Sequence, residues 1–379
     1  MATYGIPLLV LATTGSAALT GLAFALEWVP RIAAFTVAGT LVDRHGTARV
    51  FRAACLARAL TVLAAAGVLA MLDAGSPAVT TTVMLLAAST GILTEFSYVA
   101  AETAGGAASR SAGSQAHRVQ SVLLGIDQTA MLTGPLVSGL LLEHGGPTTM
   151  LGTLAAFSLL AAALGSGKRN APTSAAPAQG GLRTGWATLR SLPALAWLVA
   201  GLVVSNTAIA LLQAAMPVIV VTELGHSSAD AGLIWSAAAA ASLLAITAAR
   251  RAIDRWDLWP VGAAAAVLAA GATLAVAQAD TYRGYLLLIA VLMAGEGGLT
   301  VVLRTLRSHL IPPDVFGSTL AVTILLLLLP FPAAGLLVAA IPPAQLGHAV
   351  TAAALLQAAG LATAFIRLRT LPAPPTPAP

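Results

Sequence analysis

Long apolar stretches, separated by short polar segments, make up most of this chain. Each stretch approaches the length of about 20 mostly apolar residues that a membrane-spanning helix needs. The pattern predicts twelve helical spans, at approximately residues 1–13, 17–41, 48–71, 79–104, 118–142, 147–167, 192–221, 228–250, 258–278, 284–308, 315–340 and 345–367. We therefore expect an all-α membrane protein built as two six-helix bundles.

The polar interruptions divide the predicted spans into two halves. Residues 168–191 are rich in Gly, Ser, Pro and Ala, which is typical of a flexible linker. They separate an expected N-terminal six-helix bundle at 1–167 from a C-terminal six-helix bundle at 192–369. The end of the chain at 370–379 is mostly Pro and is expected to be disordered.

Composition supports a membrane protein and excludes a soluble one. The 379 residues are 58% hydrophobic and only 9% charged, against roughly 25% charged residues in a soluble domain. The mean hydropathy is +0.88. Although the sequence pI of 10.1 is basic, the basic residues lie in short loops between spans and form no continuous stripe. We therefore exclude nucleic acid as a partner and expect the lipid bilayer as the main solvent.

The basic residues also predict an orientation, because loops rich in Lys and Arg face the cytoplasm. If the spans alternate, one side of the membrane carries Arg44, Arg49, Arg52, Arg110, Arg118, Lys168, Arg169, Arg183, Arg190, Arg250, Arg251, Arg255, Arg304, Arg307, Arg367 and Arg369. The opposite loops carry Arg283 with Asp73, Glu143, Glu223, Asp230 and Asp280. The expected location is the cytoplasmic (inner or plasma) membrane, with the linker inside and both termini inside if the first helix spans.

The first predicted span is too short for an ordinary membrane helix. Residues 1–13 can form only about 20 Å of helix, whereas the hydrocarbon core is about 30 Å thick. Our hypothesis is that part of this helix is missing, through a misplaced start or a real truncation. The alternative is a naturally short, tilted or re-entrant helix.

A charged turn lies between the second and third predicted spans. It reads Gly39-Thr-Leu-Val-Asp43-Arg44-His-Gly46-Thr-Ala-Arg49. This segment resembles the loop signature of the major facilitator superfamily, G-x-L-x-D-R-x-G-x-x-R, at all six specified positions. The resemblance implies a fold of two six-helix bundles around a central cavity. It also implies that Asp43, Arg44 and Arg49 act as a conformational latch and not as substrate ligands.

A second motif lies in the fifth predicted span, where Gly134, Pro135, Ser138 and Gly139 occur in the order Gly-Pro-Leu-Val-Ser-Gly. It is similar to the core of the antiporter motif, G-P-x-x-G-G, with Ser in place of the first paired glycine. The resemblance implies export. The alternative is an ordinary kinked membrane helix, since Pro bends a helix and small residues allow close packing.

Carboxyl groups inside predicted spans are candidates for proton coupling, because ionisable residues are costly in lipid. A carboxyl in a low-dielectric site can take up and release a proton near neutral pH. We favour Glu95, Asp127 and Glu296 as a group, with Glu27 as a further candidate. Glu27 and Arg31 are four residues apart and could form a pair. The alternative is a structural hydrogen bond between helices at each site.

Three residues are candidates for lining a substrate cavity, namely Arg31, Trp28 and Tyr98. An aromatic ring near a helix end is alternatively explained as an interfacial anchor. An apolar cavity with a few polar groups would bind a small amphipathic molecule.

Signatures of enzymes and cofactors are absent from the sequence. It contains no phosphate-binding Walker loop, no HExxH motif and no G-x-S-x-G elbow. The single cysteine, Cys55, excludes an internal disulfide and a metal site built on several thiolates. We expect no enzymatic activity, no catalytic residue, no metal and no cofactor. The expected partners are a small-molecule substrate, protons and the bilayer, and the expected state is a monomer.

The segments around both motifs look like those of the enterobactin-exporter-like group. These segments are Glu27-Trp-Val-Pro30-Arg31 before the charged turn and Arg118-Val-Gln120 before Gly134. The resemblance implies proton-coupled export of a siderophore or drug-like molecule by alternating access. One alternative is a facilitator or symporter that imports a small nutrient. Another is a non-transporting receptor or assembly protein on a transporter scaffold.

Overall fold

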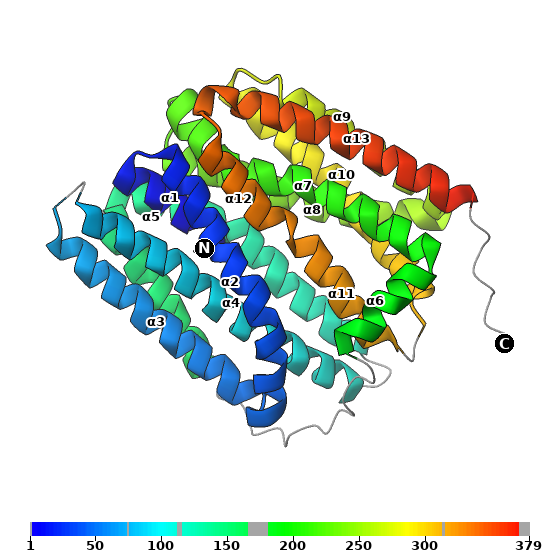
Figure 1. Cartoon of the computed structure of the whole chain (residues 1–379), viewed down its shortest axis with the longest axis horizontal. Helices are drawn as coiled ribbons and strands as arrows, with labels where there is room; N and C mark the ends of the chain where they lie inside the picture. The colour runs from blue at the N-terminus through cyan, green and yellow to red at the C-terminus, as the bar shows by residue number, and fades with distance from the viewer. Residues whose placement is uncertain (1, 74–75, 112–115, 166–180, 313–314, 371–379) are drawn as a thin grey trace. The chain divides into compact units, whose positions relative to one another are not determined.

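The computed structural model describes residues 2–73, 76–111, 116–165, 181–312 and 315–370, and helices dominate them (Figure 1). The helices are α1 (Ala2–Thr14), α2 (Ala17–His45), α3 (Thr47–Met71), α4 (Pro77–Ser111), α5 (Ala116–Leu164), α6 (Gly181–Ser191), α7 (Pro193–Val218), η2 (Ile219–Glu223), α8 (Ser228–Trp256), α9 (Leu258–Val276), α10 (Tyr282–Leu310), α11 (Phe316–Leu328), α12 (Pro330–Ala340), η4 (Pro343–Gln345) and α13 (Leu346–Thr370). The expectation of an all-α membrane protein is confirmed.

The helices follow the predicted spans closely. Within the described residues, ten helical segments are long and apolar enough to cross a membrane. One of the ten is the segment 126–164. That segment holds two predicted spans, because α5 consists of two helices that meet at Gly146 (φ +71°), just before Pro147. The predicted span 315–340 is divided into α11 and α12 ahead of Pro330, which has no N–H to donate. The first helix, α1, has 13 residues and is as short as the sequence predicts.

Part of the predicted linker is helical. Its residues 181–191 form α6, and residues 168–180 lie outside the described part of the chain. Leu182, Trp186 and Leu189 recur at helical spacing, and Leu189 is buried in a hydrophobic cluster. Gly185 allows the backbone of α6 to approach that of Ser318 on α11. This apolar face explains why the segment folds as a helix. The predicted disordered tail beyond Thr370 also lies outside the described residues.

The chain divides into two compact units by its internal contacts. Unit 1 comprises Met1–Ser174, Gln213–Ser236 and Phe331–Ala344. Unit 2 comprises Ala175–Leu212, Ala237–Pro330 and Gln345–Pro379. The N-terminal helices are therefore grouped with two segments from the second half of the sequence.

In unit 1, α2 and α4 lie side by side (Figure 1). They approach closely at Gly91 of α4, where a Cβ atom would collide with the backbone carbonyl of Glu27 on α2. A second close approach joins α2 to α12, because a Cβ on Gly335 would lie 2.6 Å from the backbone nitrogen of Ala25. Small residues at these crossings replace the hydrophobic driving force that lipid cannot supply between helices.

We predict that Gly91→Ala destabilises the protein, because the added methyl group must push α4 away from α2. Overpacking of this kind costs about 1–3 kcal/mol. Gly67→Ala in α3 is the matched control, since nothing lies within 4 Å of its Cβ position. The control should be neutral or gain up to about 1 kcal/mol of helix propensity. Thermal unfolding of both variants in detergent measures the difference, and equal melting temperatures would contradict the close crossing.

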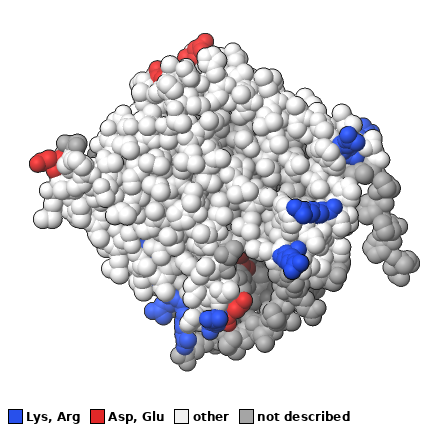
Figure 2. All heavy atoms as spheres, viewed as in Figure 1, with Lys and Arg blue, Asp and Glu red and all other residues white. Residues whose placement is uncertain are grey.

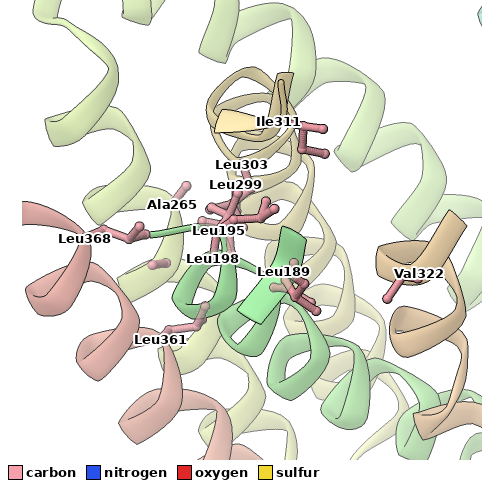
Figure 3. Packing of buried hydrophobic residues seen from close by; sticks show 12 residues of the cluster. Leu189, Leu195, Leu198, Ala265, Leu299, Leu303, Ile311, Val322, Leu361 and Leu368 are labelled. Carbon is pink, nitrogen blue, oxygen red and sulfur yellow. The ribbon is translucent and has the colours of Figure 1, made fainter. Parts of the chain in front are cut away.

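In unit 2, a cluster of buried aliphatic side chains joins α6, α7, α9, α10, α11 and α13 (Figure 3). Leu195, Leu198 and Leu303 lie in it and are no more than 2% exposed. Trp259 and Phe365 pack edge to face, with ring centroids 6.2 Å apart. The cluster holds the helices that carry the polar site of this unit.

Apolar side chains also cover much of the surface. In Figure 2 the central part of the face shows no charged residues, and Lys and Arg lie in its lower and right-hand parts. Leu60, Leu85, Leu244 and Leu287 are more than half exposed. Large apolar side chains exposed on so many helices are unusual for a soluble monomer, and lipid is their natural environment.

Candidate functional site

An ion pair joins α2 to α4 inside unit 1. The Arg31 Nε donates to Glu95 Oε2 at 2.5 Å, and the Glu95 side chain is only 2% exposed. The expected pairing of Glu27 with Arg31 is therefore wrong in this structure. Gly91 packs on the backbone of Glu27, so one helical turn further along each helix brings Glu95 beside Arg31.

Glu27 is left as a buried carboxyl without a counter-ion of its own. It is 1% exposed, and neither carboxyl oxygen accepts a hydrogen bond from a described residue. Thr3 and Tyr4 of α1 lie near this carboxyl, as does the Arg31 guanidinium of α2. Together with the ion pair, the cluster holds two carboxyl groups and one guanidinium.

Trp28 completes this cluster. The Arg31 guanidinium lies 4.5 Å from the centre of the Trp28 ring, within the range of a cation–π interaction. The ring also stacks on Phe331 of α12, with centroids 4.2 Å apart, and its centroid lies 6.1 Å from that of Phe24. Trp28 is 6% exposed, so it is a packed residue and not an interfacial anchor. Tyr98, by contrast, is 47% exposed.

Unit 2 contains a different polar cluster, centred on Glu296 of α10. Glu296 Oε1 accepts hydrogen bonds from Ser205 Oγ of α7 at 2.5 Å and from Gln357 Nε2 of α13 at 2.8 Å. The Gln357 amide also donates to Ser205 Oγ at 3.0 Å. Within the described residues, Glu296 has no cationic partner. The site therefore surrounds a 7%-exposed carboxyl with neutral hydrogen-bonding groups.

The glycines beside Glu296 explain how this site is built. A Cβ on Gly295 would lie 2.6 Å from the backbone nitrogen of Ala269 on α9, and one on Gly297 would lie 2.7 Å from the carbonyl oxygen of Ser242 on α8. Both neighbouring helices therefore press against α10 at this level. The α10 helix is continuous through all three residues.

The remaining proton-coupling candidate differs in its environment. Asp127 is exposed near the start of its apolar segment, so the expected burial does not hold for it. It is not brought into either polar cluster by any contact within the described residues.

The residues of the charged turn are also exposed. Asp43, Arg44 and Arg49 form no ion pair with any described residue. Gly46 adopts φ +84° and donates its N–H to the Val42 carbonyl at 2.8 Å, which ends α2. The turn thus requires Gly46 for its left-handed backbone. Nothing lies within 4 Å of a Cβ placed on Gly39.

The antiporter-type motif packs against the first turns of α8. A Cβ on Gly139 would collide with the Ser228 carbonyl, and one on Gly232 would collide with the Pro135 carbonyl. The Ser138 hydroxyl donates to the Gly134 carbonyl at 2.7 Å. The motif therefore forms a tight contact between helices from the two halves of the sequence, both within unit 1.

Several residues of these sites were missed by sequence reasoning. Ser205 and Gln357 are single polar residues in apolar spans, and Gln357 in particular could have been noticed for that reason. Phe331 gave no signal, because an aromatic residue in an apolar span is ordinary. A further omission is Arg58, which lies in the middle of the third span.

Comparison with known proteins identifies the family. A sequence profile described as Major Facilitator Superfamily matches residues 1–330. The fold is similar to a crystal structure of a bacterial homologue of the iron transporter ferroportin in the inward-facing state, with 16% identity and a TM-score of 0.70. It is also similar to a crystal structure of the nucleoside transporter NupG, with 12% identity and a TM-score of 0.69. Both alignments cover 97% of this chain and 94% of the other.

No curated protein matches the chain, and identities this low show a shared fold and not a shared substrate. The profile match covers well over half of the 379 residues. This match, together with the membrane helices, identifies a multi-pass membrane transporter and not an enzyme. The similar transporter structures have the same fold. The chain belongs to the major facilitator superfamily.

Proposed function

We propose that the chain is a proton-coupled secondary transporter that exports a small amphipathic molecule, siderophore-like or drug-like, across the cytoplasmic membrane by alternating access. The observation that carries this proposal is the Glu296 carboxyl, buried among the neutral groups of Ser205 and Gln357. A buried carboxyl without a cation is the kind of group that exchanges a proton.

The environment of Glu296 can stabilise both the protonated and the charged form of its carboxyl. In the neutral form, no charge needs to be buried, which avoids the large cost of an isolated ion in a low dielectric. In the charged form, the two donors on Oε1 stabilise the carboxylate. A group that tolerates both states can carry a proton through a transport cycle.

The cluster in unit 1 offers a second proton site with a built-in switch. Arg31 has one carboxylate partner, Glu95, and lies one helical turn from the unpaired Glu27. While Glu27 is protonated, Arg31 neutralises Glu95. If Glu27 loses its proton, the same guanidinium is attracted to both carboxylates. The ion pair that joins α2 to α4 then becomes weaker. A difference in stability of this kind is what a two-state transporter needs.

The direction of transport is supported by the antiporter-type motif. Gly134, Pro135, Ser138 and Gly139 resemble the motif of exporters, and the motif contacts α8. The segments that resemble the enterobactin-exporter-like group support a siderophore or a drug as cargo. For the latch, Asp43, Arg44 and Arg49 are exposed and pair with no described residue, so they can form a contact in another conformation. Asp127 has less support than Glu296 or Glu27 because it is exposed.

An accumulation assay tests this function. Cells that lack their own efflux pumps and express the chain are loaded with ethidium or, separately, with a catecholate siderophore. Export driven by protons predicts low retained probe and a rise to the level of non-expressing cells after an uncoupler is added. A fall in retained probe after uncoupling would instead indicate proton-driven import. Probe binding without flux in proteoliposomes would favour a receptor on a transporter scaffold.

A further inference from the structure

A second membrane-embedded arginine lies in unit 1. Arg58 is 11 residues after the start of α3 at Thr47 and 13 before its end at Met71. At 1.5 Å per residue, this places it roughly 16 Å along the helix, near the middle of the span. Because a guanidinium does not lose its proton in proteins, Arg58 brings a permanent positive charge to that depth.

The partners of Arg58 are neutral. Its Nε donates to Ser158 Oγ at 3.0 Å, and its Nη2 lies 3.8 Å from Cys55 Sγ. Among the described residues, no carboxylate lies within ion-pair distance of it. The contrast with Arg31, which is paired with Glu95, is clear. Arg58 uses two of its five N–H groups in these contacts.

This arrangement is costly unless an anion completes it. A charged side chain at the bilayer centre costs several kcal/mol when it has no partner. Ser158 cannot neutralise it, because its hydroxyl is uncharged and also donates to the Leu154 carbonyl at 2.8 Å. No described residue therefore neutralises the charge on Arg58.

Arg58 lines a cavity that could hold a counter-ion. The cavity has a volume of about 430 Å³ and lies between α1, α3, α4 and α5. Ser158 and Thr133 supply hydroxyl groups to its wall, whereas Val137 and Phe157 supply apolar surface. Its volume falls within the range of about 300–1,000 Å³ found for small-molecule sites. One cation, the hydroxyl groups of Thr3, Thr94, Thr133 and Ser158, and the apolar surface suit an apolar molecule with one negative group.

We propose that this cavity is a binding site for an organic anion, an apolar molecule that carries one carboxylate or phosphate group. The guanidinium of Arg58 binds the anionic group through the N–H donors that Ser158 and Cys55 leave free, and the apolar wall holds the rest of the molecule. Charge-assisted hydrogen bonds from an arginine to a carboxylate or phosphate are short and strong. The cavity borders the unit 1 cluster through Thr3 and Thr94, so binding at Arg58 is tested without a proton gradient.

Equilibrium binding of fluorescent probes in detergent, with no gradient present, tests the proposal. The anionic probes are 2-naphthoate and 2-naphthyl phosphate, and the uncharged 2-naphthalenemethanol has the same ring system. We expect the wild type to bind both anions at least about tenfold more tightly than the alcohol, since a charge-assisted contact contributes this much. In Arg58→Gln the preference should disappear, and Arg58→Lys should retain part of it.

Arg283→Gln is the matched control, because it removes the same charge from an exposed position at the start of α10. It should bind like the wild type. Equal affinities of the wild type for the anions and the alcohol would overturn the proposal, as would unchanged anion binding in a folded Arg58→Gln variant. Repeating the assay in nanodiscs identifies the source of the anion. Displacement of naphthoate by phosphatidylglycerol, but not by phosphatidylcholine, indicates a lipid phosphate, and binding in both indicates a free organic acid.

Discussion

Glu296→Gln should abolish proton-driven transport and leave substrate exchange intact. The amide has the shape of the carboxyl, and its oxygen can still accept hydrogen bonds from Ser205 and Gln357. What it cannot do is bind and release a proton. Removing a proton-transfer group commonly costs a factor on the order of 100 or more. We therefore expect net transport driven by a pH gradient to fall by about 100-fold, while exchange of labelled for unlabelled substrate across the membrane continues.

Proteoliposomes measure both activities on one preparation. A pH gradient drives net transport in the first assay, and equal internal and external pH with substrate on both sides drives exchange in the second. Glu223→Gln is the control, because Glu223 is an exposed carboxyl at the end of η2 and its loss should leave both activities unchanged. A folded Glu296→Gln variant that retains wild-type net transport would reject Glu296 as a proton carrier.

The membrane spans could be predicted because lipid leaves the backbone few choices. A spanning segment must satisfy its own hydrogen bonds, so length and apolarity together predict a helix. The turns at Gly46 and Gly146 could also be predicted, because a glycine in a polar interruption marks a turn. In the structure both glycines have the positive φ that favours this residue. In contrast, the helix at 181–191 was hidden, because its Gly and Ser content obscured the spacing of Leu182, Trp186 and Leu189.

The partners inside the polar sites could not be predicted from the sequence. Spacing on α2 suggested that Arg31 pairs with Glu27, but the choice of partner depends on how closely α4 approaches. That approach is set by Gly91, which is 60 or more residues away along the chain. Similarly, the site around Glu296 needs Ser205 and Gln357 from two further helices. Contacts between distant helices depend on packing, which no local pattern reports.

The unit 1 cluster gives the second large expected effect, a strongly non-additive loss of stability. In Glu95→Gln, Arg31 loses its ion-pair partner but still has Glu27 one helical turn away on α2. We expect it to form that pair, which limits the loss to about half of the 3–5 kcal/mol that breaking a buried ion pair costs. Glu27→Gln alone should cost less than Glu95→Gln, because Arg31 keeps its ion pair with Glu95.

The double variant Glu27→Gln/Glu95→Gln removes both anions and leaves the Arg31 guanidinium, whose side chain is only 15% exposed, without a counter-ion. Its loss should reach the full 3–5 kcal/mol, more than the sum of the two single losses. Unfolding of the three variants in mixed micelles, compared with Glu223→Gln, measures the coupling directly. Additive losses would mean that Arg31 does not exchange partners. The excess loss would measure how strongly Arg31 is attracted to Glu27 when Glu95 is neutral. The same attraction drives the proposed switch, because Arg31 must also respond when Glu27 itself gains or loses its charge.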